Sequence, residues 1–263
     1  MSCQGEFSTH RRAGTDVTKF ANGSHPAGGR FVDAMTSTGA AGMHSYLDSL
    51  QSAGVRLADD LHVVSSRPLT VRHRWMPGPT LLDDSSQSDP TAFAEAIAEI
   101  GHWVCALEGT DARIDTNLAN FCLENGRPVL VDVLPPLVPS VCPTPVTRFE
   151  ELFDVLCFDT PVVLDALISY ALRALLSAHP DAARALLPVH EEIPTGAPDP
   201  GFPALWFHAR RALAVRAAKG EVDVASVHEF FALTSVLGFK QLDEFHRYQR
   251  IRSVARRLRE SQR

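Results

Sequence analysis

The spacing of hydrophobic residues changes near residue 75. Before that point, short runs of alternating apolar and polar residues predict β-strands at residues 16–20, 61–64 and 69–73. Within the same part, residues 43–53 carry apolar side chains every three or four positions, which predicts a helix closed by Gly54. The buried face of this helix is expected to contain Met43, Tyr46, Leu47 and Leu50.

After residue 75 the apolar spacing is mainly helical. Asp89 and Pro90 begin a helix whose buried face is expected to contain Phe93, Ile97, Ile100, Val104 and Leu107. Further helices are predicted at residues 148–158, 161–178, 203–218, 222–237 and 242–260. We therefore expect an α+β chain, in which His102 and Trp103 pack against other residues and do not bind a ligand.

Two segments are predicted to be irregular. Residues 21–42 are dense in glycine, which favours a mobile connection. Residues 135–145 are rich in proline, which excludes a helix or the interior of a sheet and predicts an extended loop.

Three polar residues stand at a spacing typical of phosphoryl-transfer sites. Asn120 follows Asp115 by five positions, and Asp132 comes after a run that predicts a β-hairpin with an Asn-Gly turn at residues 125 and 126. Such a hairpin would carry Asn120 at one end and Asp132 at the other, both near Asp115. The alternative is an ordinary hairpin in which these residues cap turns for local reasons, and the motif alone leaves both interpretations open.

Residues 113–132 resemble the aminoglycoside-phosphotransferase and protein-kinase-like superfamily, most closely its small-molecule kinase branch. The corresponding loops there run His-x-Asp, four residues, Asn, then a hydrophobic strand and Ile-Asp. This chain departs from the pattern, since Arg113 and Ile114 replace the usual residues before Asp115, and residues 133–136 differ from the usual ending. The resemblance implies a two-lobed protein-kinase-like fold, with a small, abbreviated β-rich N-lobe at residues 1–74 and a larger, mainly helical C-lobe at residues 75–263.

The resemblance also implies roles for particular residues. Asp115 would be the catalytic base, and Asn120 and Asp132 would hold Mg²⁺. The ATP site would combine a loop over the phosphates, a strand lysine and a linker beside the adenine, formed by Gly5, Phe7, Ser8, Lys19, Arg74, Trp75 and Met76. In the family, a helix glutamate pairs with the strand lysine, but no glutamate occurs here between Glu6 and Glu95. Asp33 or Asp48 could replace it, or the pair could be absent.

Composition limits the other possibilities. The chain has 263 residues, of which 45% are hydrophobic and 21% charged, as in ordinary soluble proteins. A net charge of -6 argues against general nucleic-acid binding, although the arginine-rich residues 247–263 could form either a nucleic-acid face or a solvated helix face. The five cysteines form no C-x-x-C pair, which indicates free thiols and no zinc site. Because no segment is typical of a signal peptide or a membrane span, we expect a cytoplasmic protein that does not bind membranes.

These observations predict an ATP-dependent phosphotransferase that acts on a hydroxyl group of a small molecule, such as an antibiotic or a natural product. Glu150, Glu151, Asp154 and Asp159 could bind a cationic acceptor, although most are expected to serve as helix-start and surface carboxylates. One rival hypothesis is a catalytically weak or inactive kinase-like protein that binds nucleotides or regulates a partner. Another is a metal-assisted hydrolase, but the histidines form no i,i+4 metal pair.

Overall fold

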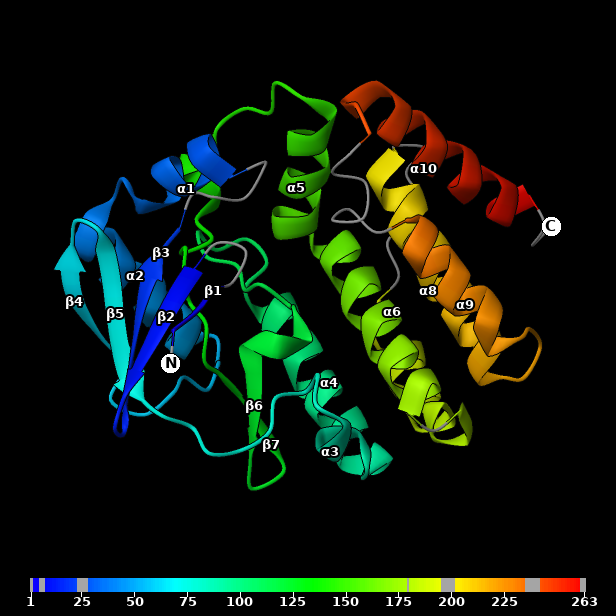
Figure 1. Cartoon of the computed structure of the whole chain (residues 1–263), viewed down its shortest axis with the longest axis horizontal. Coiled ribbons are helices and arrows are strands. Elements are labelled where there is room, and N and C mark those ends of the chain that lie inside the picture. The colour runs from blue at the N-terminus through cyan, green and yellow to red at the C-terminus, as the bar shows by residue number, and fades with distance from the viewer. Residues whose placement is uncertain are drawn as a thin grey trace.

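The N-terminal and C-terminal parts of the chain differ in their content of strands and helices (Figure 1). The computed structural model describes residues 2–4, 8–22, 28–178, 180–194, 202–234 and 242–260. Within these residues, a small antiparallel sheet is formed by the N-terminal part and most helices belong to the C-terminal part. The predicted α+β fold class is confirmed.

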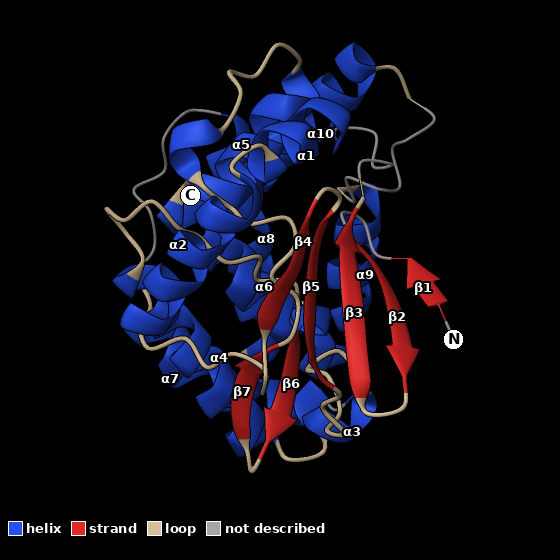
Figure 2. Ribbon diagram, turned by 90° about the vertical axis from the view of Figure 1, so that its left-hand side faces the viewer, coloured by secondary structure: helices blue, strands red, loops and turns tan. Residues whose placement is uncertain are grey.

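The N-terminal sheet has five strands in the order β1-β2-β3-β5-β4, all antiparallel (Figure 2). The strands are β1 (Ser2–Gln4), β2 (Ser8–Ala13), β3 (Asp16–Ala21), β4 (His62–Ser66) and β5 (Leu69–Arg74). The three predicted strands correspond to β3, β4 and β5, so these predictions are confirmed.

Two helices accompany the sheet. Helix α2 (Gly39–Ser52) buries the four residues predicted for its apolar face, and Gly54 follows it with a positive φ of 80°. Helix α1 (Gly28–Thr36) lies in the segment predicted to be a mobile connection, so that prediction was wrong for these residues. Phe31, Val32 and Met35 are buried and anchor α1 to the core, and its glycines lie in the first turn, where the helix gains little from a side chain.

The C-terminal part begins with the short α3 (Asp84–Gln87), which is followed by α4 (Pro90–Ala106). Asp89 caps α4 as predicted, since its carboxylate accepts hydrogen bonds from the main-chain N–H groups of Thr91 and Ala92 at 3.1 Å. A second, two-stranded sheet follows the 3-10 turn η1 (Leu118–Asn120) and consists of β6 (Phe121–Glu124) and β7 (Arg127–Leu130). This hairpin lies between the large sheet and the helices (Figure 1).

The remaining elements are η2 (Pro139–Val141), α5 (Arg148–Phe158), α6 (Thr160–Ala178), η3 (Pro180–Leu186), α7 (Leu187–Glu192), α8 (Phe202–Ala218), α9 (Val224–Leu233) and α10 (Glu244–Glu260). The predictions for α5, α6 and α8 are confirmed to within one residue. Helix α7 was not predicted. In the structure Pro188 occupies the first turn of α7, where proline loses no hydrogen bond.

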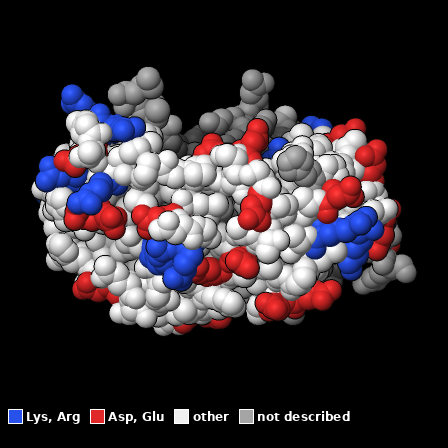
Figure 3. All heavy atoms as spheres, turned by 90° about the horizontal axis from the view of Figure 1, so that it is seen from below, with Lys and Arg blue, Asp and Glu red and all other residues white. Residues whose placement is uncertain are grey.

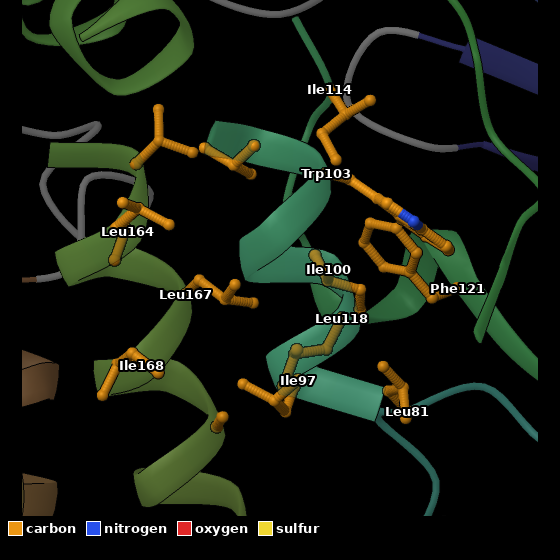
Figure 4. Close-up of a cluster of buried hydrophobic side chains, with 14 of the residues drawn as sticks. Leu81, Ile97, Ile100, Trp103, Ile114, Leu118, Phe121, Leu164, Leu167 and Ile168 are labelled. Carbon is orange, nitrogen blue, oxygen red and sulfur yellow. The ribbon is translucent and has the colours of Figure 1, made fainter. Parts of the chain in front are cut away.

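The core of the C-terminal part is formed by α4, α6 and the hairpin. Ile97, Ile100 and Trp103 of α4 lie between α6 and Phe121 of β6 (Figure 4), and the rings of Trp103 and Phe121 are 6.4 Å apart. Full burial of each such side chain contributes about 1.5–3 kcal/mol. The packing role predicted for Trp103 is confirmed, whereas His102 is exposed and does not pack into the core.

Helix α6 is long and apolar enough to cross a membrane by length and composition, with a mean hydropathy of 1.5 over its most apolar window. No segment typical of a membrane span was expected from the sequence, so α6 departs from that expectation in length and composition. Most of that window, 67%, is buried inside the protein, which is the arrangement of a core helix.

On the face seen in Figure 3, acidic and basic side chains are intermixed.

Candidate active site

The β6–β7 hairpin brings the predicted metal-binding residues together. Its turn has the predicted Asn-Gly geometry, since Asn125 and Gly126 have φ values of 52° and 76°. At the open end of the hairpin, the Val131 N–H donates to the main-chain oxygen of Asn120 at 2.8 Å. Asn120 therefore lies opposite the residue that precedes Asp132.

Asp115 lies in the loop before η1 and is held by local hydrogen bonds. The Asn117 N–H donates to its carboxylate at 2.9 Å, and the amide of Asn120 donates to its main-chain oxygen at 3.4 Å. The residue keeps solvent-accessible surface, but the dense protein around it raises the pKa of its carboxyl, and the negative charge of Asp132 acts in the same direction. The hydrogen bond from Asn120 places Asp115 beside the residue at the open end of the hairpin.

Asp132 connects the hairpin to the large sheet. Its Oδ2 is 3.2 Å from Nζ of Lys19 and accepts a hydrogen bond from Oγ of Ser8 at 2.8 Å. Its Oδ1 accepts from the N–H of Leu134 at 3.2 Å. Lys19 and Ser8 are both buried, so three of the predicted site residues meet in one ion-paired group between the two parts of the chain.

Lys19 pairs with Asp132 and not with a helix carboxylate. Asp33 and Asp48, the two candidates for the missing glutamate, are both exposed. The inward position on α2 is instead taken by Tyr46, whose hydroxyl donates to the main-chain oxygen of Arg113 at 2.8 Å. Burial raises the pKa of Tyr46, and the charges of Asp115 and Asp132 act in the same direction.

Arg113 stabilises the end of a helix and does not face Asp115. Its Nη1 donates to the main-chain oxygens of Leu107, Thr110 and Ala112 at 2.7, 2.9 and 2.7 Å, directly after α4. A cation at this place also complements the negative helix C-terminus. The sequence analysis assigned no role to Arg113 or to the hydroxyl of Tyr46, because each contacts residues far away in the sequence or outside the motif.

The large sheet presents ordered rows of side chains on the face that carries Lys19. Lys19 is paired with His10 on β2 and with Val71 on β5. Two residues earlier on β3, Val17 is paired with His73 on β5, so His73 lies on the same face one row away. Burial lowers the pKa of both His10 and His73, and the nearby charge of Lys19 lowers them further.

The predicted adenine linker divides into two parts. Met76 is buried in a small apolar cluster with Ala58, Cys122 and Val129, between the large sheet and the hairpin. Arg74 is exposed and pairs with Asp60, while the half-exposed ring of Trp75 is covered by the guanidinium of Arg12 at 4.1 Å. The structure thus brings Met76 to the hairpin but directs the side chain of Arg74 elsewhere. Gly5 and Phe7 lie outside the described residues.

Residues 77–81 continue from the linker along the hairpin. Leu123 N–H donates to the main-chain oxygen of Pro79 and Leu81 N–H to that of Phe121, both at 2.9 Å. Gly78 is required here, because a Cβ at this position would lie 2.1 Å from the main-chain oxygen of Leu123. The linker is thereby fixed to the strand that leads to Asn120.

The donor chemistry at the hairpin is compatible with magnesium. Asp132 and Asn120 offer a carboxylate and an amide oxygen, the hard ligands that Mg²⁺ prefers, and Mg²⁺ at phosphate sites commonly uses only one or two protein ligands. Within the described ranges, no group of three or more His, Cys, Asp or Glu side chains gathers that could hold a metal. Lys19 and Ser8 would have to release Asp132 when it binds a cation.

Two of the acidic residues considered for the acceptor act at helix starts, as expected for most of them. Asp159 accepts a hydrogen bond from the Val162 N–H at the beginning of α6, and Glu150 pairs with Arg30 at the beginning of α5. Asp154 accepts a hydrogen bond from the thiol of Cys142 at 3.2 Å. Burial, together with this hydrogen bond, raises the pKa of Cys142 to about 12.

Comparisons with known proteins give a limited result. No known family model matches the sequence, and no curated protein matches it. Among solved structures, the chain is similar to a choline/ethanolamine kinase family protein from Mesorhizobium loti, with a TM-score of 0.43 and 13% identity over 98% of this chain and 87% of the other. A likeness of this degree carries no inference about activity, so the function has to be argued from the side chains of the site.

Proposed function

We propose that this chain is an ATP-dependent phosphotransferase that phosphorylates a hydroxyl group of a small molecule, such as an antibiotic or a natural product. The observation that carries the proposal is the group of Lys19, Asp132 and Ser8, with Asp115 and Asn120 beside it. A basic residue, two carboxylates and an amide in one place are the components that phosphoryl transfer requires.

In this proposal each residue has a separate task. Lys19 binds phosphate oxygens. Asp115 orients the acceptor hydroxyl and accepts its proton while the hydroxyl oxygen bonds to the terminal phosphorus of ATP. The bond from that phosphorus to the leaving ADP breaks in the same step. Magnesium held by Asn120 and Asp132 would neutralise phosphate charge that otherwise repels the acceptor.

One observation supports a second candidate, a catalytically weak kinase-like nucleotide-binding protein. Both oxygens of Asp132 already accept hydrogen bonds, and Lys19 pairs with the carboxylate that would bind the metal. Nucleotide and cation would have to displace these contacts. A nucleotide-binding protein in which the cation does not displace the contacts of Asp132 would turn over weakly or not at all.

The proposed activity is tested by screening hydroxylated small molecules with ATP and Mg²⁺, and by detecting a product heavier by one phosphoryl group by mass spectrometry. Asp115→Asn should reduce turnover by at least about a hundredfold, the usual contribution of a positioned base. Its melting temperature should stay close to that of the wild type, because the Asn117 N–H can still donate to the amide oxygen. Undiminished turnover in this variant would remove Asp115 from the role of base, and nucleotide binding without any product would favour the second candidate.

A further inference from the structure

His73 carries a buried ring nitrogen without a hydrogen-bond partner. The residue is 3% exposed, and its Nδ1 lies 2.8 Å from the main-chain oxygen of Arg74. Because a carbonyl oxygen can only accept, Nδ1 must carry the ring proton, which leaves Nε2 as an acceptor with a free lone pair. The structure gives Nε2 no partner within the described residues. An unpaired buried acceptor is unfavourable, so this atom gains from a ligand that offers an N–H group.

The position of His73 relative to Lys19 relates this atom to the proposed nucleotide. The two residues lie on the neighbouring strands β5 and β3 (Figure 2), and the strand register places them on the same face of the sheet, one row apart. One row corresponds to two residues of a strand, or about 7 Å. If Lys19 binds phosphate, His73 lies toward the linker, at the end of the site where the base is expected.

Three main-chain groups at the start of the linker already have hydrogen-bond partners. The Arg74 N–H donates to Asp59 at 2.8 Å and the Trp75 N–H donates to Thr15 at 2.6 Å, in both cases to the main-chain oxygen. The Arg74 oxygen accepts from His73. These three groups belong to the linker that was expected to lie beside the adenine, and Nε2 of His73, in the residue before it, is a buried side-chain atom without a partner.

We propose that His73 selects the base of the donor nucleotide, with Nε2 accepting a hydrogen bond from the exocyclic amino group of adenine. The inference rests on the proposed function. A base with a carbonyl oxygen at the same position would direct a lone pair at the lone pair of Nε2. Reversing the ring tautomer would remove that repulsion only by breaking the hydrogen bond from Nδ1 to Arg74. His73 therefore favours a 6-amino purine over a 6-oxo purine.

Protonation of Nε2 would reverse the preference for a 6-amino purine. The surroundings of His73 disfavour this protonation. Burial lowers the pKa of His73, and the charges of Lys19 and His10 act in the same direction, while the hydrogen bond to Arg74 and the charge of Asp132 act in the opposite direction. The net effect places the pKa below the ordinary value of 6.5, so the ring is neutral at neutral pH.

The test compares ATP with ITP, which differ at the position of this amino group, by isothermal titration calorimetry in the presence of Mg²⁺. Wild-type protein should bind ATP about tenfold more tightly than ITP, the ratio expected for one buried hydrogen bond gained or opposed. His73→Phe should bring the two Kd values to within about twofold of each other. His62→Phe is the matched control: the same substitution at an exposed histidine of β4, whose Nε2 contacts Arg72, should leave the ratio unchanged.

Equal affinity of the wild type for ATP and ITP would overturn the proposal, as would an unchanged ratio in a folded His73→Phe variant. If that variant does not fold, ¹⁵N NMR of labelled wild-type protein replaces it: the Nε2 resonance of His73 should shift on addition of ATP but not of ITP, and a lack of any difference would overturn the proposal. Failure of the wild type to bind either nucleotide would contradict the proposed function itself, and the role of His73 would fall with it.

Discussion

Two residues explain how the loop around Asp115 keeps its position. Arg113 is attached to the end of α4 through three main-chain oxygens. The hydroxyl of Tyr46 then connects α2 to the main chain of Arg113, two residues before Asp115. The helix beside the large sheet is thus joined to the loop that carries the proposed base.

Tyr46→Phe removes only this hydroxyl, so we expect a loss of stability of about 1 kcal/mol and a fall in kcat of about tenfold, with a smaller change in KM for ATP. Tyr170→Phe is the matched control, because its hydroxyl accepts from Arg210 at 2.7 Å, within the helical part. That variant should lose comparable stability but keep its kcat. Equal kcat values for the two variants in steady-state assays would show that Tyr46 does not position Asp115.

At the scale of elements, the connection between the sheet and the hairpin depends on one close main-chain contact. A methyl group on Gly78 would collide with the main-chain oxygen of Leu123, which belongs to β6 and cannot move without disturbing the hairpin. The same hairpin carries Asn120 and leads to Asp132. Strain at Gly78 should therefore affect both the stability of the chain and the binding of nucleotide.

Gly78→Ala should lower the free energy of unfolding by about 1–3 kcal/mol, as overpacking of a closed contact usually does. Gly29→Ala provides the control, because nothing lies within 4 Å of its added Cβ and its backbone is helical. The control should be neutral or slightly stabilising. Chemical denaturation of both variants measures the difference, and equal stability would show that the linker can shift away from β6.

The elements were more predictable than the contacts between them. Local patterns were sufficient for the strands β3, β4 and β5 and for the Asn-Gly hairpin. They were not sufficient for α1, because its glycines do not favour a helix. The helix forms because Phe31, Val32 and Met35 pack into a core formed by distant residues. Likewise, the spacing of the motif predicted that Asp115, Asn120 and Asp132 would be neighbours, but the pairing of Asp132 with Lys19 depends on how the two parts of the chain meet.

At the scale of the whole molecule, buried charged groups hold the helical part together. Arg211 of α8 binds Asp165 of α6 at 3.0 Å and donates through Nε to Nδ1 of His190 of α7 at 2.9 Å. Because Nδ1 of His190 must accept, its protonation would break this hydrogen bond. Burial lowers the pKa of His190, and the charge of Arg211 contributes in the same direction.

This arrangement predicts a decline in stability in mild acid. The pKa of His190 in the folded chain lies below the ordinary value of 6.5, so the unfolded chain binds more protons below about that pH, and stability falls as the pH falls. His10 and His73 have lowered pKa values and act in the same direction, whereas the raised pKa of Asp115 acts in the opposite direction at lower pH. Melting temperatures between pH 7.5 and 5.5 should decrease, and His190→Gln should reduce the decrease. A rise in melting temperature over this range would contradict the prediction.

The central claim is that Asp132, Asn120 and Lys19 form a site for a nucleotide and a divalent cation. The most direct test is the melting temperature with ATP alone and with ATP and Mg²⁺, for the wild type and for Asp132→Asn. At an ATP concentration about a hundred times Kd, binding should stabilise the wild type by about 2.7 kcal/mol, most of it dependent on Mg²⁺, and the metal-dependent part should disappear in Asp132→Asn. If the melting temperature of the wild type does not change when ATP and Mg²⁺ are added together, the claim is contradicted.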